Sequence, residues 1–446
     1  MQKRLSCCIS AALLVFFLAA NTDGQQTPRP ADPWMQVAKL TASFDQGGEL
    51  VGTSVAVDGD TAVVGYPYVY TATGAGEALV FVKPTKGWTN LTQAAVLVPS
   101  DGNFGDYFGI AVATRGDVIV VGASQDQFKS VGPGAAYVFV KPASGWKGQL
   151  TETAKLVASD GMKADGMGSS VGISGDTIVA GAPGSSCSST PSGGAGYIFV
   201  KPTGGWKNAT QTAKLTVSDA GTYDELGYSV SIDGNTVVMG APYAFGGSNQ
   251  EDGAAYVFVE PSGGWKDSTQ TAKLSASDAA KYDALGYSVS IAGTAVAAGA
   301  PYAAVGSNQK EGAAYVFVEP SGGWKNMTET AKLTEADGKA GDLLGSSVAT
   351  SGSVVAAGAA EYSRGPNLKQ GGGPAFWQEG ALYLFAEPTG GWTTASSKIK
   401  LNGSDARYRA WLGSSLALRG NIIITGAPAL SYLSPWQGAA YLFERP

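Results

Sequence analysis

The chain has 446 residues, with 30 basic and 36 acidic side chains and a net charge of −6. It contains no histidine, which excludes Ser-His-Asp and Cys-His catalysis and zinc sites built on histidine. It has no basic tract, so we expect no nucleic acid among its partners.

Residues 1–20 have the pattern of a secretory signal peptide. Two basic residues precede an apolar run over 9–20, which is shorter than the roughly 20 apolar residues that cross a bilayer. Residues 21–33 form a Pro-rich linker and 34–446 a single domain. Cys187 is the one cysteine after the leader, so no intramolecular disulfide can form. We expect a secreted, extracellular monomer, free or associated with the cell surface, that does not insert into a membrane.

One unit of sequence recurs along the rest of the chain. Its last leucine returns at spacings of 57, 59, 59, 59, 59 and 68 residues. These leucines are Leu40, Leu97, Leu156, Leu215, Leu274, Leu333 and Leu401. A fixed period of this length indicates a solenoid, a propeller or an array.

Each unit predicts four short strands. In its clearest copy, a strand with period-two alternation over 229–232 leads through a two-residue turn into an apolar run over 236–239. A third strand, rich in aromatic and β-branched residues, follows over 254–259, and 265–274 supplies a more polar fourth strand. Seven such units predict an all-β fold, a seven-bladed β-propeller of four-stranded antiparallel blades.

The two ends of the chain complement each other. The last unit stops after its third strand, at 440–443, whereas 34–40 matches only a fourth strand. We therefore expect the N-terminal strand to complete the last blade. This closure would cover a sheet edge that would otherwise lie open.

Short glycine motifs recur at two places in the units. They include Phe108-Gly109 with Gly122-Ala123, Leu226-Gly227 with Gly240-Ala241-Pro242, and Leu412-Gly413 with Gly426-Ala427-Pro428. In these motifs the chain resembles the FG-GAP repeats of integrin α-subunit propellers and of many secreted propeller proteins. The resemblance covers the whole mature chain and implies the propeller fold and a role in adhesion or recognition. Integrin propellers bind calcium in a longer loop, and the two-residue turns here are too short to wrap that ion, so we do not expect calcium binding of that type.

An acidic pair precedes the first strand in five units. The pairs are Asp101 and Asp106, Asp160 and Asp165, Asp219 and Asp224, Asp278 and Asp283, and Asp337 and Asp342. The first unit has Glu49 near the second position, and the last keeps only Asp405. We interpret each carboxylate as an acceptor of backbone N–H groups that fixes the turn. The alternative is weak binding of a cation such as Ca²⁺; we expect no other cofactor.

Four sequons for N-glycosylation are present, at Asn90, Asn208, Asn326 and Asn402. The first three follow a Gly-Trp step at one position of the repeat, and we expect surface glycans there in a eukaryote. The tryptophan of that step recurs in six units and is interpreted as packing. An Arg-Gly-Asp triplet, 115–117, falls on a predicted hairpin tip where other units carry similar residues, so we interpret it as a turn.

The connection between the second and third strands varies most from unit to unit. In the sixth unit it is longest and carries Phe376 and Trp377, and the seventh unit has Tyr432 and Trp436 in its equivalent loop. We expect these four side chains to form one exposed aromatic patch that binds a ligand. The alternative is that they fold over the rim and pack on each other.

The sequence favours a binding protein over an enzyme. Its acidic residues follow the repeat and leave no unique pair for acid–base work, so we expect no catalytic activity. The first hypothesis is a protein-interaction or adhesion-type module that docks an extracellular protein. The alternative is a lectin-like propeller that binds glycans or polysaccharide, favoured by Tyr243 and Tyr302 with the neighbouring Asn249 and Asn308 in two nearly duplicate units.

Overall fold

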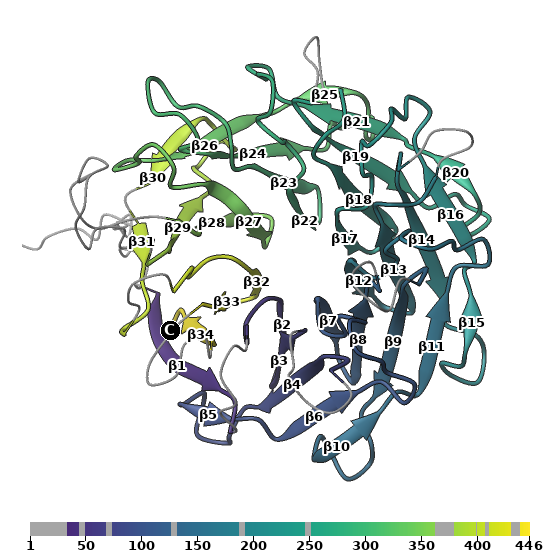
Figure 1. Cartoon of the computed structure of the whole chain (residues 1–446). Coiled ribbons are helices and arrows are strands. Elements are labelled where there is room, and N and C mark those ends of the chain that lie inside the picture. Colours follow the sequence, from purple (N-terminus) through teal and green to yellow (C-terminus); the bar gives the residue numbers. More distant parts are fainter. Residues whose placement is uncertain are drawn as a thin grey trace, which may run out of the picture. The chain divides into compact units, whose positions relative to one another are not determined.

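The computed structural model describes residues 34–43, 50–67, 74–125, 132–186, 192–245, 251–361, 379–397, 399–405, 410–429 and 438–446. Within these ranges every regular element is a strand, and the strands form seven sheets. The sheets stand as blades around a central channel, so the protein is a seven-bladed β-propeller (Figure 1). The predicted fold class is confirmed. The signal peptide and linker predictions concern residues outside the described ranges.

Each blade is an antiparallel meander that runs outward from the channel (Figure 1). The first strands are β2 (Val55–Asp58), β7 (Ala111–Arg115), β12 (Ser170–Ser174), β17 (Ser229–Asp233), β22 (Ser288–Ala292), β27 (Leu344–Thr350) and β32 (Leu416–Arg419). The second strands are β3 (Thr61–Tyr66), β8 (Val118–Ala123), β13 (Thr177–Ala182), β18 (Thr236–Ala241), β23 (Ala295–Ala300), β28 (Val354–Ala359) and β33 (Ile422–Ala427). The third strands are β4 (Glu77–Val82), β9 (Ala135–Val140), β14 (Ala195–Val200), β19 (Ala254–Val259), β24 (Ala313–Val318), β29 (Ala381–Ala386) and β34 (Ala439–Glu444). The fourth strands are β6 (Ala95–Val98), β11 (Ala154–Val157), β16 (Ala213–Thr216), β21 (Ala272–Ser275), β26 (Ala331–Glu335), β31 (Ile399–Leu401) and β1 (Met35–Thr41).

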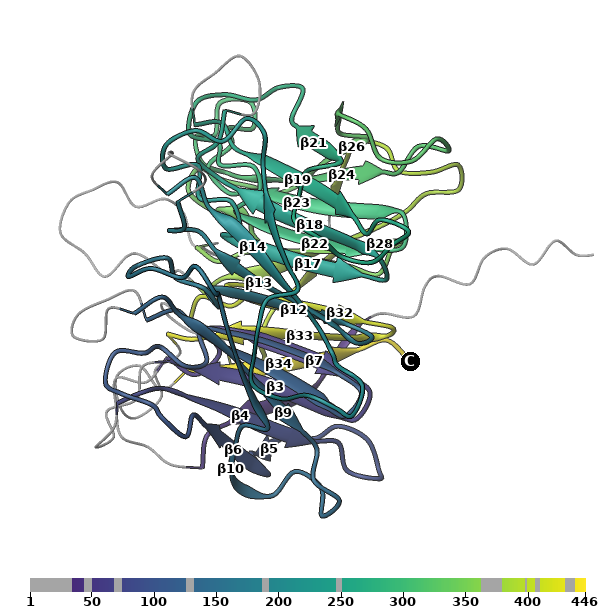
Figure 2. The ribbon, with the colours of Figure 1, turned by 90° about the vertical axis from the view of Figure 1, so that its right-hand side faces the viewer.

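The strands run between the two faces of the ring (Figure 2). One face, called the loop face, carries the connections from the second to the third strand and from each blade to the next. The opposite face, called the turn face, carries the turns between the first two strands and the Gly-Trp bends. We number the blades from one to seven by their first strands, from β2 to β32.

The turns between first and second strands are two residues long in six blades. Their glycines have φ between 55° and 58°, the left-handed region in which a side chain is strained. Blade six departs from this prediction, because three residues join β27 to β28 and Gly352 has a φ of 94°. There the Thr350 hydroxyl accepts a hydrogen bond from the Gly352 amide at 3.0 Å, which holds the longer turn.

Neighbouring blades meet backbone to backbone near the channel. Gly240 of β18 faces the carbonyl oxygen of Gly286 in the next blade, and a Cβ on Gly240 would stand 1.8 Å from that oxygen. The Ser229 hydroxyl donates to the same oxygen at 2.8 Å. The close approach of a glycine to a carbonyl oxygen of the next blade is repeated at the six other blade boundaries. The glycines of the two motifs are therefore required where one blade approaches the next.

Farther out, seven apolar clusters fill the spaces between adjacent blades. The tryptophans of the Gly-Trp step belong to these clusters and are at most 8% exposed. They are Trp88, Trp146, Trp206, Trp265, Trp324 and Trp392. This burial leaves none of the six as an open platform for a ligand.

The N-terminal strand completes the last blade, as predicted. Strand β1 pairs antiparallel with β34, with Leu40 opposite Ala440 and Lys39 opposite Tyr441. The two strands lie side by side although they come from opposite ends of the described chain (Figure 1).

The predicted fourth strand is wrong in one respect. The segment after each Gly-Trp bend divides into two strands, and its first part pairs in parallel with the fourth strand of the preceding blade. These fifth strands are β5 (Leu91–Thr92), β10 (Gly148–Thr151), β15 (Ala209–Thr210), β20 (Ser268–Thr269), β25 (Met327–Thr328) and β30 (Ala395–Ser397). Without a fifth strand, the fourth strand would expose its outer edge. The segment from the next blade of the same chain covers part of that edge.

Candidate functional site

The first aspartate of each of the five acidic pairs, and the single Asp405 of the last unit, are held by the following blade. Each of these six aspartates accepts a hydrogen bond from a buried tyrosine of the third strand and forms an ion pair with a lysine of the fourth strand. The hydroxyl bonds are Tyr137 to Asp101 (3.0 Å), Tyr197 to Asp160 (2.9 Å), Tyr256 to Asp219 (3.5 Å), Tyr315 to Asp278 (3.0 Å), Tyr383 to Asp337 (2.7 Å) and Tyr441 to Asp405 (2.5 Å). The lysines, in the same order, are Lys155, Lys214, Lys273, Lys332, Lys400 and Lys39. Each lysine nitrogen also lies 5.1–5.7 Å from the centre of its tyrosine ring.

The second aspartate closes its own turn. Asp106, Asp165, Asp224, Asp283 and Asp342 each accept the backbone N–H of the residue three positions earlier, at 2.5–2.9 Å. All five are at most 8% exposed. Among the described residues, no group of three or more acidic or cysteine side chains is arranged to hold a metal ion. Weak cation binding at these pairs stays a prediction.

Charge and hydrogen bonding act against burial at the first aspartates. Burial alone would raise the pKa of Asp278, but the hydrogen bond and charge of Lys332 and the hydroxyl of Tyr315 hold that pKa below its ordinary value. The same arrangement lowers the pKa of Asp101 and Asp160. These carboxylates are therefore ionised near neutral pH and matched by a lysine.

We expect Asp278→Ala to lower the free energy of unfolding by about 1–3 kcal/mol, because it leaves the buried Tyr315 hydroxyl without its acceptor. In a Tyr315→Phe background the same substitution should cost less, since no hydroxyl is left unpaired. Urea unfolding of the wild type, both single variants and the double variant measures the coupling. Additive costs would contradict the structural role.

The predicted aromatic patch lies outside the described residues. This applies to Phe376, Trp377, Tyr432 and Trp436, and also to Glu49, Asn249 and Cys187. Asn308 is described, and its amide nitrogen donates to Glu311 at 2.7 Å and to the Gly338 carbonyl at 3.1 Å. Its N–H donors are therefore engaged within the protein rather than presented to a sugar.

A cavity of about 780 Å³ opens on the loop face, and we call it the mouth. Six of the seven blades contribute to its wall. Its lining includes Tyr107, Tyr223, Tyr228 and Tyr287, with small residues such as Ser169 and Ser414 around the rest. Glu225 is the one carboxylate, and neither lysine nor arginine lies among the described residues that line it. A separate cavity of about 580 Å³ lies along the channel between the first strands.

Four tyrosines form a continuous row beside the mouth, which we call the tyrosine row. Their order is Tyr243, Tyr228, Tyr287 and Tyr302, with ring centroids 6.5, 5.1 and 6.1 Å apart. They come from blades four and five only. Tyr243 is 38% exposed, and the other three are half-buried. The row is therefore a partly exposed aromatic surface on one side of the ring.

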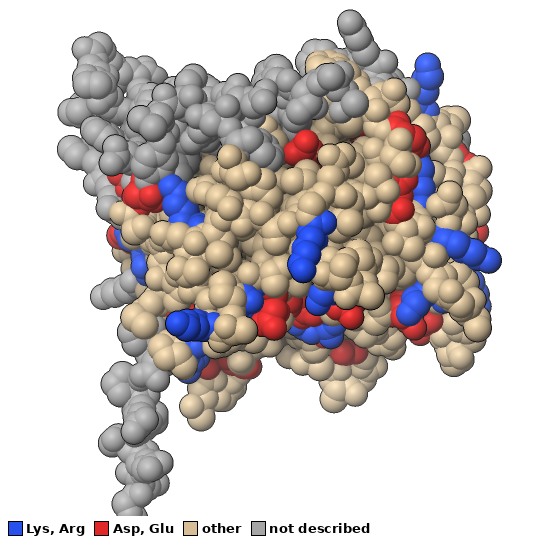
Figure 3. All heavy atoms as spheres, turned by 90° about the horizontal axis from the view of Figure 1, so that it is seen from below, with Lys and Arg blue, Asp and Glu red and all other residues tan. Residues whose placement is uncertain are grey.

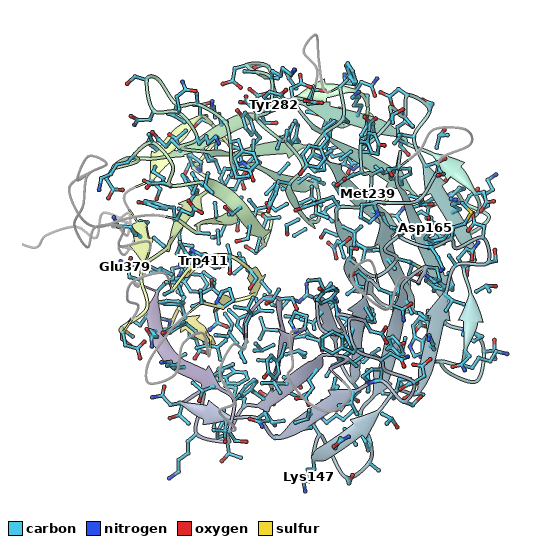
Figure 4. All side chains as sticks on the ribbon, viewed as in Figure 1. Lys147, Asp165, Met239, Tyr282, Glu379 and Trp411 are labelled. Carbon is cyan, nitrogen blue, oxygen red and sulfur yellow. The ribbon has the colours of Figure 1, made fainter. Side chains whose placement is uncertain are left out.

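The row breaks the symmetry of the repeat. Tyr228 and Tyr287 each follow the glycine of the first motif, at the loop-face end of the channel. The residues at the same place in the other blades are Thr53, Ile110, Ser169, Ser346 and Ser414. Glu225 lies between the turn aspartate Asp224 and the leucine of the first motif. Other blades have Ala284, Leu343 or Trp411 at this position of the repeat. Trp411 lies on the inner side of the ring (Figure 4).

Burial raises the pKa values of ionisable groups in and beside the mouth and so favours their protonated, neutral forms. Burial, and then the neighbouring Tyr287, raise the pKa of Tyr228 well above its ordinary value, so its hydroxyl stays protonated. Burial also raises the pKa of Tyr243, Tyr302 and Glu225. The mouth thus offers aromatic faces, hydroxyl groups and one carboxyl group to a ligand.

The sequence prediction reached half of this row. It singled out Tyr243 and Tyr302 but assigned no role to Tyr228 and Tyr287. The available signal was the departure from small residues at one position of the repeat. That departure in two adjacent units predicts neighbouring side chains once the propeller is assumed.

The Arg-Gly-Asp triplet at 115–117 lies at a hairpin turn, as predicted. Arg115 and Asp117 flank Gly116 in the two-residue turn of blade two, where the Gly116 amide donates to Asp58 at 2.7 Å. Asp117 also pairs with Lys141 at 3.4 Å.

On the side of the ring that Figure 3 shows, basic and acidic side chains are interspersed rather than gathered by sign. Within the described ranges the structure contains no apolar helix of membrane-spanning length.

The blades, the channel and the mouth define a repeat protein of the β-propeller class. Six segments match the FG-GAP repeat family, at residues 34–81, 91–139, 150–199, 209–258, 268–317 and 327–385. The chain belongs to the FG-GAP repeat family.

No curated protein matches the chain. Among solved structures, the chain is similar to the computationally designed Ika8 protein, with a TM-score of 0.47 and 14% identity over 91% of this chain and 98% of that one.

Proposed function

We propose that this protein is a secreted, non-catalytic binding module that docks an extracellular protein at the mouth, with the tyrosine row as its anchor. The observation that carries the proposal is the confinement of the row to blades four and five. A scaffold residue would recur in every blade, as the Asp–Tyr–Lys contacts do in six of them. Tyrosine is enriched among the residues that dominate binding energy at protein interfaces.

The ring geometry supports one docking site rather than seven. The row, Tyr223 and Glu225 all come from blades four and five and the connections that lead into them, whereas blades one, three and seven contribute small residues to the mouth. Tyr107 of blade two also lines the mouth but is only 8% exposed. A partner that reaches the mouth would therefore meet most of its exposed aromatic surface on the side of blades four and five. The aromatic patch predicted from the sequence at Phe376, Trp377, Tyr432 and Trp436 stays a second candidate contact area for the same partner.

The test uses a substitution that the chain itself contains. Tyr228→Ser together with Tyr287→Ser gives blades four and five the residue of blades three and six, so the fold should be retained. We expect the double variant to unfold at nearly the wild-type temperature and to lose at least tenfold in affinity, about 1.4 kcal/mol, for its partner.

Photo-crosslinking identifies that partner. A photoreactive phenylalanine at the exposed position 243 is irradiated with extracellular proteins of the source, and the same group at Lys147, on the turn face, is the control. A protein adduct should form from position 243, be absent from position 147, and disappear in the double serine variant. Adducts that are equal from both positions would count against docking at the mouth.

A lectin is the second candidate. Tyr228 with Tyr243, and Tyr287 with Tyr302, form two edge-to-face pairs of nearly equal spacing in nearly duplicate blades. Two equivalent pairs would suit a glycan with repeating sugars. A glycan and polysaccharide panel, run with the wild type and with the double serine variant, distinguishes the two functions: sugar binding that the variant loses would replace the protein-docking proposal.

A further inference from the structure

We propose that Asn90, Asn208 and Asn326 carry N-linked glycans in the folded protein and that Asn402 does not. The glycans would then stand on alternate blades at the outer circumference of the ring. This inference rests on the proposed secretion of the chain, because the modifying enzyme works in the secretory pathway.

At the three positions the amide side chain is divided between two roles. The Oδ1 atom accepts the backbone N–H of the preceding blade's fourth strand: Asn90 from Lys39 at 2.8 Å, Asn208 from Lys155 at 2.8 Å and Asn326 from Lys273 at 2.9 Å. This bond uses the oxygen and leaves the nitrogen, to which a glycan is attached, outside it. A glycan on Nδ2 is therefore compatible with the contact between blades.

The sequon residues alternate in exposure. Asn208 and Thr210 are exposed, whereas Ala209 between them is half-buried, as expected for an extended segment with a period of two. The triplets at Asn90 and Asn326 have the same pattern. The amide and the hydroxyl that define each sequon thus face solvent on the same side of β5, β15 and β25.

The scaffold needs an acceptor at this position but does not need asparagine. In blade four, Asp267 Oδ1 accepts the Lys214 amide of blade three at 2.7 Å. In blade six, Thr394 Oγ1 accepts the Lys332 amide of blade five at 3.2 Å. The chain therefore contains its own unglycosylatable versions of the same contact. An aspartate at the other positions should keep the fold and remove only the attachment nitrogen.

Asn402 has a different setting. It is half-buried, its Oδ1 is buried without a hydrogen-bond partner, and it follows the fourth strand β31 directly. The serine of its sequon is also engaged, since Ser404 receives a hydrogen bond from Gln36 on its hydroxyl at 3.1 Å and donates its amide to Gln36 at 2.7 Å. A glycan here would stand against the contact that joins β1 to blade six.

The proposed step is a transfer from a lipid-diphosphate oligosaccharide, the donor class of the secretory transferase. The Asn Nδ2 forms a bond to the anomeric carbon of the first sugar, and the bond from that carbon to the diphosphate oxygen breaks. One amide proton leaves to a base of the transferase, and the lipid diphosphate departs with its electron pair. The Oδ1 atom is unchanged and can still accept its hydrogen bond.

The full chain is expressed in a eukaryotic secretory host and treated with peptide-N-glycosidase, which converts each glycosylated asparagine to aspartate. Peptide mass spectrometry should find aspartate at 90, 208 and 326 and asparagine at 402. The variants Asn90→Asp, Asn208→Asp and Asn326→Asp should each lose one glycan and still unfold in a single cooperative transition. Thr210→Ala removes the Asn208 sequon without touching the asparagine and should lose the same glycan.

Two outcomes would overturn the proposal. They are secreted protein with unmodified asparagine at the three positions, and a glycan at Asn402 as abundant as at the others. If the native leader fails to export the chain, the prediction of secretion fails instead. The same chain behind the host's own leader then gives the answer on the glycans.

Discussion

Replacing Gly240 by alanine should lower the free energy of unfolding by about 3 kcal/mol or more, one of the largest effects available in this chain. The new Cβ would stand 1.8 Å from the Gly286 carbonyl oxygen and 2.5 Å from the Ser229 hydroxyl. The hydroxyl can rotate away, but the carbonyl belongs to the backbone of the next blade. The two blades would have to separate along their shared apolar cluster.

Guanidinium unfolding of Gly240→Ala beside Gly263→Ala tests this. Gly263 has open space around its Cβ position and no positive φ, so its substitution should change the unfolding free energy by less than about 0.5 kcal/mol. Ser229→Ala in the Gly240→Ala background should restore little, because the carbonyl remains. A cost below about 1 kcal/mol for Gly240→Ala would mean that blades shift easily at this contact.

The second large effect should come from Glu335→Gln as a dependence on pH. Glu335 is 5% exposed and lies with two other buried acids, Asp342 at 2% and Glu311 at 3%. Burial, and then the charges of Asp342 and Glu311, raise the pKa of Glu335 well above its ordinary value. The pKa of Asp342 is also raised, and burial is the largest cause. The native protein therefore keeps a proton that the unfolded chain releases.

The sign follows from this difference in proton binding. Below the unfolded pKa of about 4.3 both states hold the proton, and the contribution of neutral Glu335 to stability is complete. As pH rises from there towards the raised folded pKa, the unfolded state alone loses its proton, so stability falls by up to about 1.4 kcal/mol per pH unit. Glutamine cannot ionise, so Glu335→Gln should be more stable than the wild type at pH 7.

Urea unfolding at intervals between pH 4.5 and pH 8 measures the two slopes. The wild type should lose stability across this range more steeply than Glu335→Gln. The exposed Glu387→Gln serves as the matched control and should give a profile parallel to the wild type. Parallel profiles for all three proteins would show that Glu335 is ionised in the folded state.

The fold could be predicted because its signals are local. A glycine with positive φ at each two-residue turn, period-two strands and a constant repeat are all visible without knowing which strands meet. The fifth strands could not be predicted in this way. The two residues of β20 (Ser268–Thr269) gain their strand character from a neighbour in the preceding blade, and no pattern within two residues reports that neighbour.

The candidate site was predictable only where it departs from the repeat. Tyr228 fits strand alternation, and it becomes informative only by comparison with Ser169 and Ser346 at the same position. Glu335 follows the same logic, because Val217 and Ala276 occupy its place in earlier units and are buried there. The resemblance to FG-GAP repeats was confirmed and accounts for the scaffold, whereas the ligand depends on residues that differ between blades.

The pairing of β1 with β34 also sets an order of events during synthesis. Strand β1 emerges before all the other described strands, and its partner is made last. The ring cannot close until then, so its final contact spans nearly the whole chain, the kind of long-range pairing that folds slowly. Before closure, β1 and the blade edges on either side of the gap are open to strands from other chains. Closure therefore competes with aggregation while the chain is being made.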